Sequence, residues 1–191
     1  MKNLKGVVLS GGKSTRMGSD KGLLPINGTN WATHMLTLFE ALKMPAILSI
    51  NPDQYKQYRA IFPPEKLQMD KDLPIAGPLK GLLSVHLRFP DDDLFLIACD
   101  MIDMEKELMQ NLIDLYNEDD KHNFFVYQHE NFIEPFCGIY TSLGLKKVMD
   151  QVKNNKLKDF SLQNVLATIS TKRVSIGSTT AFKNYNYGSD L

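Results

Sequence analysis

The sequence predicts a three-layer α/β domain with a mainly parallel, mixed sheet and helices on both faces. Short apolar runs alternate with segments of helical period, and two late strand-like runs stand close enough to pair. The early runs cover residues 6–10, 46–50, 66–69 and 94–99. Each is too short for a helix and apolar enough to be covered on both faces, which is typical of central parallel strands.

Helices are expected between these strands. The first has an apolar face of Trp31, Met35, Leu38 and Leu42, and another begins at Pro78 and carries Leu79, Leu82, Leu83 and Leu87. A helix around 53–62 should end at Pro63-Pro64, and a helix over 104–118 should start from Asp103 as its N-cap. The helical pattern returns at 143–152 and 161–169.

The second half of the chain should add antiparallel strands. "NFFVYQ" (123–128) and "FIEPFCGIY" (132–140) are separated by three residues, so we expect them to pair, and a last strand is expected at 173–176. No linker, repeat or change of composition divides the chain. Residues 1–191 are therefore expected to form one domain.

Composition narrows the class of partner. The 22 basic residues balance the 22 acidic ones, so we expect no nucleic acid and no membrane as a partner, but a small molecule. The sequence has neither a spanning segment nor a signal peptide, which predicts a cytoplasmic protein. Cys99 and Cys137 lie in apolar runs and should be buried, reduced thiols. The nine methionines and Trp31 are assigned to the core.

Polar residues follow four of the predicted strands. They are Ser10-Gly11-Gly12, Asn51, Asp70 and Asp100. Each alone is also a common turn or cap residue. Ligands of open α/β sheets bind beyond the carboxyl ends of the strands, so four such ends on one edge predict a binding site there.

The loop after the first strand has the composition of a phosphate cradle. Gly11 and Gly12 lack a Cβ, so backbone N–H groups can approach an anion, while Lys13, Arg16 and Lys21 supply positive charge. Arg16 can hold two phosphate oxygens, and Lys21 offers a mobile point charge. The glycine spacing fits neither G-x-x-x-x-G-K-[ST] nor G-x-G-x-x-G, so the cradle is of another type.

Asp100 ends the buried run "LFLIACD" and is a candidate Mg²⁺ ligand. Mg²⁺ takes oxygen ligands and commonly needs only one or two carboxylates beside phosphate oxygens. The alternative role is a helix N-cap, for which Asp103 is better placed. The four histidines are scattered and neither cysteine has a CxxC partner, so a zinc site is not expected.

The run "LSGGKSTRMGSDKGLL" resembles the nucleotidyltransferase signature L-x-G-G-x-S-x-R-M-G-x-x-K-x-L-L, and is most similar to the molybdenum cofactor guanylyltransferase family. Further similarities follow in order: "SIN" ending at Asn51, Asp70 followed by "GPLKGLLS", "ACDM" around Asp100, "IEPFCGIY" and the terminal "FKNYN". The resemblance covers essentially the whole chain. It implies the Rossmann-like nucleotidyltransferase fold.

The resemblance also implies an activity: Mg²⁺-dependent transfer of GMP from GTP to the terminal phosphate of molybdopterin, with release of pyrophosphate. It places nucleotide contacts on Leu9, Ser10, Gly11, Lys21, Asn51, Asp70 and Asp100, to which the cradle adds Gly12, and the metal on Asp100. Catalysis would then depend on Arg16, Lys21 and Asp100. A protein that delivers the pterin is a further candidate partner.

This sequence departs from the family pattern in three places. Ser10 stands where alanine is usual, Glu134-Pro135 replaces His-Pro, and the tail lacks a Thr-Pro pair. Candidate substrate-binding residues are Gly77, Pro78, Glu134, Asn184 and Asn186.

Other functions stay open. The same chemistry could use CTP, with molybdopterin or a polyol phosphate as acceptor, because Asn51 and Asp70 could read guanine or touch ribose. A nucleotide-binding domain without catalysis is the other alternative. The presence of both Lys21 and Asp100 favours an enzyme.

Overall fold

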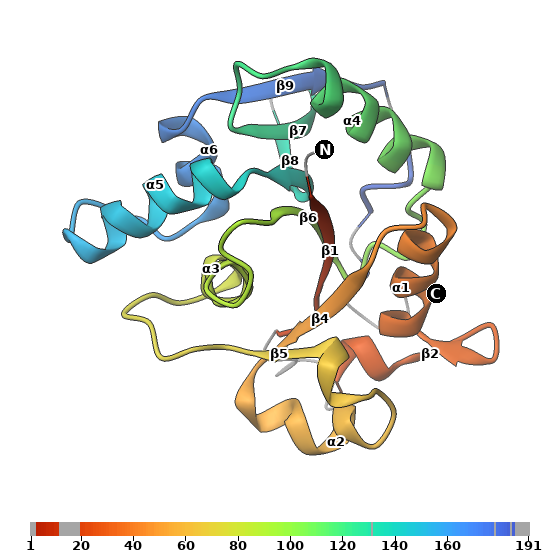
Figure 1. Ribbon diagram of the computed structural model, residues 1–191. Coiled ribbons are helices and arrows are strands. Elements are labelled where there is room, and N and C mark those ends of the chain that lie inside the picture. Colours follow the sequence, from red (N-terminus) through yellow and green to blue (C-terminus); the bar gives the residue numbers. More distant parts are fainter. Residues whose placement is uncertain (1–2, 12–19, 131, 178, 184, 186–191) are drawn as a thin grey trace.

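The computed structural model describes residues 3–11, 20–130, 132–177, 179–183 and 185. Within these ranges, seven strands form one sheet in the order β5-β4-β1-β6-β8-β7-β9 (Figure 1). Their bounds are Leu4–Leu9 (β1), Ala46–Ile50 (β4), Leu67–Met69 (β5), Asp93–Ala98 (β6), Phe124–His129 (β7), Phe132–Tyr140 (β8) and Thr171–Ser175 (β9). Strand β8 is antiparallel to β6 and β7, and the other pairings are parallel. The predicted mixed, mainly parallel sheet is confirmed.

Helices cover both faces of the sheet, which confirms the three-layer prediction. The α-helices are Trp31–Ala41 (α1), Tyr55–Arg59 (α2), Pro78–His86 (α3), Lys106–Glu118 (α4), Ser142–Lys153 (α5) and Leu162–Thr168 (α6); short 3₁₀ turns are Lys21–Leu23 (η1), Pro52–Gln54 (η2) and Pro64–Lys66 (η3). Helices α3, α5 and α6 lie on one face, and α1 and α4 lie on the other (Figure 1). No described helix has the length and apolar character that crossing a membrane requires.

The two apolar layers follow from the alternation of side chains along the strands. Val7 of β1 packs in the cluster of α3, α5 and α6, whereas its neighbour Val8 packs in the cluster of α1, α2 and α4. Both are fully buried. A strand with both faces covered must be apolar at successive positions, which is why β1 and β6 could be recognised in the sequence.

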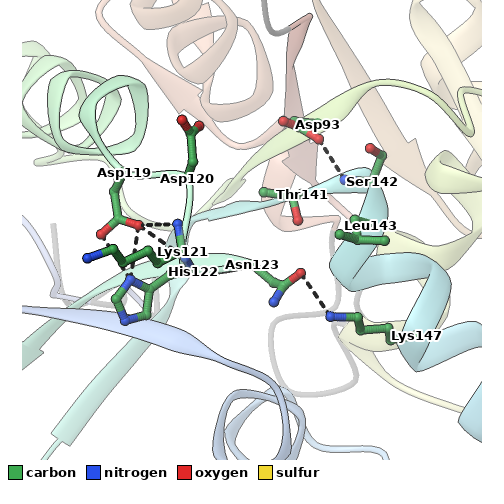
Figure 2. Close-up of a pocket in the computed structure, with 10 residues that line it drawn as sticks. All are labelled: Asp93, Asp119, Asp120, Lys121, His122, Asn123, Thr141, Ser142, Leu143 and Lys147. Carbon is green, nitrogen blue, oxygen red and sulfur yellow. Dashed lines mark hydrogen bonds and ion pairs between the residues drawn. The ribbon is translucent and has the colours of Figure 1, made fainter.

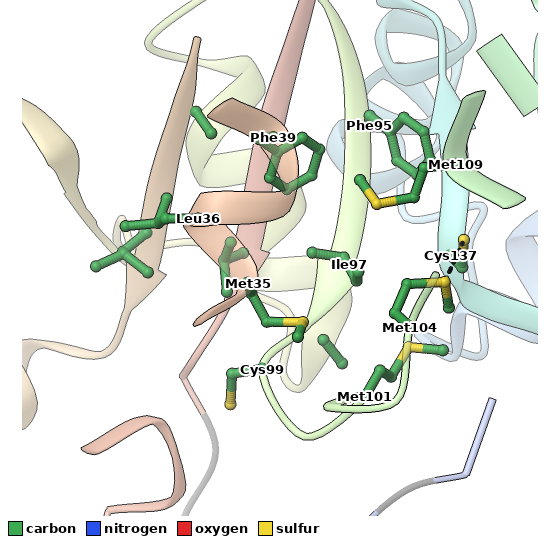
Figure 3. Close-up of a cluster of buried hydrophobic side chains, with 14 of the residues drawn as sticks. Met35, Leu36, Phe39, Phe95, Ile97, Cys99, Met101, Met104, Met109 and Cys137 are labelled. Atoms are coloured by element: carbon green, nitrogen blue, oxygen red, sulfur yellow. Dashed lines mark hydrogen bonds between the residues drawn. The ribbon is translucent and has the colours of Figure 1, made fainter. Parts of the chain in front are cut away.

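Sulfur-containing side chains fill much of the second cluster (Figure 3). Met35, Met104 and Met109 pack there, and Cys137 Sγ lies 4.0 Å from Met104 Sδ. Both cysteines are free and buried, as predicted. Burial raises the pKa of Cys99 to about 12, so this thiol stays protonated at neutral pH.

Two predicted helix faces need correction. In α1 the buried stripe is Ala32, Met35, Leu36 and Phe39, with Trp31 in a separate small cluster, whereas Leu38 and Leu42 are only partly buried. The helix is thus rotated by about one position from the predicted face. Leu87 follows the last residue of α3 and is 37% exposed, so it is not part of the buried face of that helix.

Two predicted helix boundaries were also wrong. Helix α4 begins at Lys106 after Glu105, so Asp103 is not its N-cap; the Asp103 carboxylate instead accepts a hydrogen bond from Tyr185 Oη at 2.6 Å. The helix expected around 53–62 is broken into η2 and the five-residue α2. The Asp103 carboxylate thus has a partner other than the helix that it was expected to cap.

A short hairpin before α1 was missed. Strands Pro25–Ile26 (β2) and Thr29–Asn30 (β3) pair across Asn27-Gly28, whose φ angles are +47° and +77°. Asn-Gly is the common choice where both central turn residues need positive φ, so the signal was present in the sequence. The hairpin leads directly into α1, because Asn30 caps that helix by accepting from Thr33 N at 2.9 Å.

Close packing of α1 on β1 gives the first prediction. A Cβ on Gly6 would lie 2.6 Å from Phe39 Cδ1 and 2.8 Å from Ala46 Cβ. We expect Gly6→Ala to lower the free energy of unfolding by about 1–3 kcal/mol, because the buried ring must move. Urea denaturation measures this loss. Gly177→Ala, with open space around its Cβ position, is the matched control, and equal stabilities of the two variants would contradict the packing argument.

Candidate active site

Four parallel strands end on the same side of the sheet, at the carboxyl ends of the strands. We name this row of strand ends the carboxyl edge. Strands β5, β4, β1 and β6 are neighbours and parallel, so the residues that follow them lie in a row: Asp70, Asn51, Ser10 and Asp100. Backbone hydrogen bonds extend the ladder to this edge, from Asp70 N to Ile50 O at 2.9 Å and from Ser10 N to Ser49 O at 2.9 Å. The topology thus brings together the strand-end residues singled out in the sequence.

An ion pair joins the cationic segment to this edge. Lys21 Nζ lies 3.0 Å from Asp100 Oδ2, and the two side chains are 22% and 18% exposed. Lys21 opens η1, and Asp100 follows β6, 79 residues further along the chain. Gly12, Lys13 and Arg16 lie outside the described residues. The two side chains expected to act together are therefore in contact, while their roles stay predictions.

Asp20, for which the sequence predicts no role, is the centre of a hydrogen-bond network beside Lys21. Its Oδ1 accepts from Gly22 N at 3.0 Å and from Tyr58 Oη at 2.8 Å, and its Oδ2 accepts from Gln54 Nε2. Gln54 Nε2 also donates to Ser10 O at 2.8 Å. A sequence signature could not reveal this residue, because two of its three partners, Gln54 and Tyr58, lie 34 and 38 residues away.

Asn51 has a structural function at the carboxyl edge. Its amide oxygen accepts from Gln54 N at 3.1 Å, and Gln54 Oε1 accepts from Asn51 N at 2.8 Å, which forms a reciprocal capping box on η2. The amide oxygen of Asn51 is therefore engaged within the protein.

Asp70 presents an unsatisfied acceptor. Its Oδ1 is buried and has no hydrogen-bond partner within the described part of the chain. Burial raises the pKa of Asp70 above its usual range, although the charge of Lys80 opposes the shift. Buried polar atoms are normally hydrogen-bonded, so an acceptor of this kind is suited to a ligand that donates.

The other predicted residues occupy different parts of the same edge. Leu9 ends β1, and a Cβ on Gly11 would lie 3.4 Å from Asn51 N, which is an ordinary contact with the neighbouring strand end. Gly77 precedes Pro78 at the start of α3 with φ +71°, a conformation that favours glycine. Glu134 is a half-buried residue of β8. It lies three residues before Cys137, which pairs with Ile97 near the end of β6, so Glu134 is close to the carboxyl end of that strand.

The C-terminal segment contacts the Asp100 turn. Tyr185 N donates to Asp100 O at 3.3 Å, its hydroxyl donates to Asp103, and its ring meets Trp31 edge-on at 6.5 Å. Asn184 and Asn186, on either side of Tyr185 in the sequence, lie outside the described residues.

The chain matches the model of the MobA-like NTP transferase domain over residues 6–171. It belongs to this family.

The names of similar proteins from other organisms are consistent with this family. A "Molybdenum cofactor biosynthesis bifunctional protein" of Synechocystis sp. is 30% identical over 143 residues, which are 75% of this chain and 40% of that protein. This chain therefore spans less than half the length of that relative. A "Probable molybdenum cofactor guanylyltransferase" of Carboxydothermus hydrogenoformans is 29% identical over 168 residues, covering 84% of this chain and 78% of that protein.

A solved structure shares the fold. Molybdopterin-guanine dinucleotide biosynthesis protein A from Archaeoglobus fulgidus superposes with a TM-score of 0.76 at 15% identity, covering 97% of this chain and 94% of that one. The Rossmann-like nucleotidyltransferase fold that the resemblance implied is thereby confirmed.

In this member of the MobA-like family, a pocket of about 350 Å³ lies at the opposite edge of the sheet (Figure 2). It is formed by the start of β6, the end of β8 and the loop that connects α4 to β7. Its acidic groups are engaged: Asp93 accepts from Ser142 N at 2.6 Å, and Asp119 pairs with His122 at 2.9 Å and Lys172 at 3.3 Å. These contacts stabilise the fold far from the carboxyl edge.

Asp119 gives a pH-dependent prediction. Burial alone would raise the pKa of Asp119, but hydrogen bonds from Lys121 N, His122 and Lys172 outweigh it and hold this pKa well below its usual range. The stabilisation is then present above the unfolded-state pKa of about 4 and is lost as the pH falls below it. We expect Asp119→Asn to lower stability by about 1 kcal/mol at pH 7, and by less at pH 3.

Urea denaturation at several pH values measures this effect. Asp150→Asn, on the exposed side of α5, is the control and should change stability little at either pH. A constant deficit of Asp119→Asn between pH 7 and pH 3 would show that the carboxylate charge is not responsible.

Proposed function

We propose that this chain transfers GMP from GTP to the terminal phosphate of molybdopterin and releases pyrophosphate. The observation that carries the proposal is the Lys21–Asp100 pair on the carboxyl edge. Family membership and the names of the relatives support a nucleotidyl transfer of this kind. The identity of the acceptor, molybdopterin, and that of the nucleotide base, guanine, both belong to the proposal.

Lys21 and Asp100 have complementary tasks towards a bound triphosphate. The ammonium of Lys21 would exchange its contact with Asp100 for phosphate oxygens, where positive charge stabilises the negative charge that develops on the leaving group. Arg16 is predicted to add a second cation.

Asp100 fits a role as ligand of Mg²⁺. Its carboxylate supplies a hard oxygen donor at the strand end, and the described residues contain no group of three or more His, Cys, Asp or Glu that could hold a metal unaided. A site with one carboxylate suits a magnesium ion that arrives with the triphosphate, because this ion keeps phosphate oxygens and waters among its ligands. When bound, Mg²⁺ would neutralise phosphate charge.

The transfer needs no protein nucleophile. An oxygen of the acceptor phosphate attacks the α-phosphorus of GTP, the bond from that phosphorus to the α–β bridging oxygen breaks, and its electron pair leaves with pyrophosphate. A phosphate monoester is largely ionised near neutral pH, so no strong general base is required. The protein contributes positioning and charge, which are the main terms in phosphoryl transfer.

Of Asp70 and Asn51, Asp70 is the better candidate for recognising the guanine base. A guanine offers N1–H and N2–H donors, and the buried Oδ1 of Asp70 is an unpartnered acceptor within the described residues. Ser49 Oγ, also buried and without a partner there, lies close by, since a Cβ on Gly81 would be 2.8 Å from it and 3.5 Å from Asp70 Oδ1. Asn51 uses its amide oxygen for the capping box, so we assign it to holding the edge.

On the acceptor side, we propose that molybdopterin lies between the Gly77-Pro78 turn and Glu134. Asn184 and Asn186, which lie outside the described residues, stay predicted substrate-binding residues.

Removal of either charge should abolish most turnover. We expect Lys21→Ala and Asp100→Ala each to lower kcat by about 10²–10³, as the loss of one preorganised charge contact does in other enzymes. Pyrophosphate release with GTP and molybdopterin measures this. Lys147→Ala, which removes a lysine at the opposite edge, should keep full activity. Near-normal turnover in both site variants would refute the assignment.

Base selection can be tested with a panel of nucleotides. We expect pyrophosphate release with GTP and molybdopterin to exceed that with CTP, ATP or UTP, and Asp70→Asn to lower kcat/KM for GTP by about 10–10², because a carboxylate acceptor is lost. Equal or faster release with CTP would support a cytidylyltransferase instead. Tight GTP binding without release, with any acceptor, would support a non-catalytic domain.

A further inference from the structure

Three donors converge on the carboxylate of Asp20, directly before Lys21 in the chain. Gly22 N and Tyr58 Oη donate to one oxygen, and Gln54 Nε2 donates to the other. The contacts come from η1, η2 and α2, so they connect segments that are 34 and 38 residues apart. Only the hydrogen bond from Gly22 N caps η1, so the other two hydrogen bonds serve to connect Asp20 to η2 and α2.

The partners of Asp20 are themselves fixed in the protein interior. Tyr58 is fully buried and stacks on Phe62 at 5.8 Å, and Gln54 is 7% exposed. Gln54 also donates to Ser10 O and exchanges two hydrogen bonds with Asn51, so it is tied to the ends of β1 and β4. Asp20 is thereby held by the same strand ends that form the carboxyl edge.

Gly22 shows how closely η1 is pressed against these partners. A Cβ on Gly22 would lie 2.2 Å from Tyr58 Oη and 3.2 Å from Ser10 Oγ. A side chain there would displace the tyrosine hydroxyl, and with it the donor to Asp20. Lys21 therefore stands between two residues that both lie against Tyr58, Asp20 through its carboxylate and Gly22 through its Cα.

We propose that Asp20 is a positioning residue for Lys21: its hydrogen bonds to Tyr58, Gln54 and Gly22 N hold η1 so that the Lys21 ammonium stays at the carboxyl edge beside Asp100. Asp20 acts through Lys21, because both of its carboxylate oxygens are engaged within the protein. The catalytic consequence rests on the proposed function, whereas the positioning itself does not.

A second aspartate provides a matched comparison. Asp93 also accepts from a buried tyrosine, Tyr116, and from a backbone N–H, that of Ser142, but it lies at the opposite edge of the sheet. Loss of either carboxylate should cost stability, because each accepts from a buried tyrosine and from a backbone N–H. Only the loss of Asp20 should affect Lys21.

The first test uses no nucleotide. Acetylation of the Lys21 amine by an N-hydroxysuccinimide ester is followed by peptide mass spectrometry in the wild type, Asp20→Asn and Asp93→Asn. We expect Lys21 to react at least about threefold faster in Asp20→Asn. The Nδ2 of the asparagine is a donor and would face the Gln54 Nε2 donor, so this hydrogen bond is lost and η1 is released. Asp93→Asn should leave the Lys21 rate unchanged. A Lys21 rate in Asp20→Asn equal to the wild type would overturn the proposal.

The second test is a double-mutant cycle on turnover with GTP and molybdopterin. We expect Asp20→Asn to lower kcat by about 10–10² with KM for GTP changed less than about threefold, since a misplaced catalytic group costs rate at a given affinity. In the Lys21→Ala background the same change should cost less than about twofold. An undiminished cost in that background would show a general structural effect and overturn the proposal.

Tyr58→Phe covers the case in which Asp20→Asn does not fold. It keeps the buried ring and removes one donor, so we expect a smaller rise in Lys21 acetylation and a smaller fall in kcat, of about two- to fivefold. No change in either would contradict the proposal. If the wild type transfers no nucleotide, the proposed function fails, and the acetylation rates still decide whether Asp20 positions Lys21.

Discussion

The parallel pairing of β1 between β4 and β6 is the constraint on which the molecule depends. Four ladder positions join β1 to β4 and six join it to β6, and the strand is apolar towards both faces. Because parallel neighbours end at the same edge, this pairing alone places Ser10, Asn51 and Asp100 in one row. The close approach of Gly6 to α1 keeps one helix layer in contact with that strand.

Local patterns were enough to predict the layers of the fold. Runs such as "VVL" and "LFLIA" are apolar at every position, which in such short runs is typical of a strand covered on both faces, so these two central strands were predicted to within two residues at each end. Helix details were less predictable. Asp103 was expected to cap the helix over 104–118, but its carboxylate accepts from Tyr185, 82 residues away, and no local rule can anticipate such a partner.

The candidate site was predictable to a similar degree. Lys21, Asp70 and Asp100 stand at strand ends or in a recognisable signature, so their residue types indicated phosphate, base and metal chemistry. Asp20 and Gln54 gave no such signal, because their importance comes from hydrogen bonds across more than 30 residues. Charged residues at strand ends or in a signature are thus easier to single out in a sequence than the residues that hold them in place.

The edge contact between Trp31 and Tyr185 makes the protein a natural optical reporter. Trp31 is the single tryptophan of the chain, is fully buried and has no hydrogen-bond partner for its indole nitrogen among the described residues. Its emission therefore comes from one environment, which the C-terminal segment completes beside the Asp100 turn. Intrinsic fluorescence should register any displacement of that segment without an attached dye.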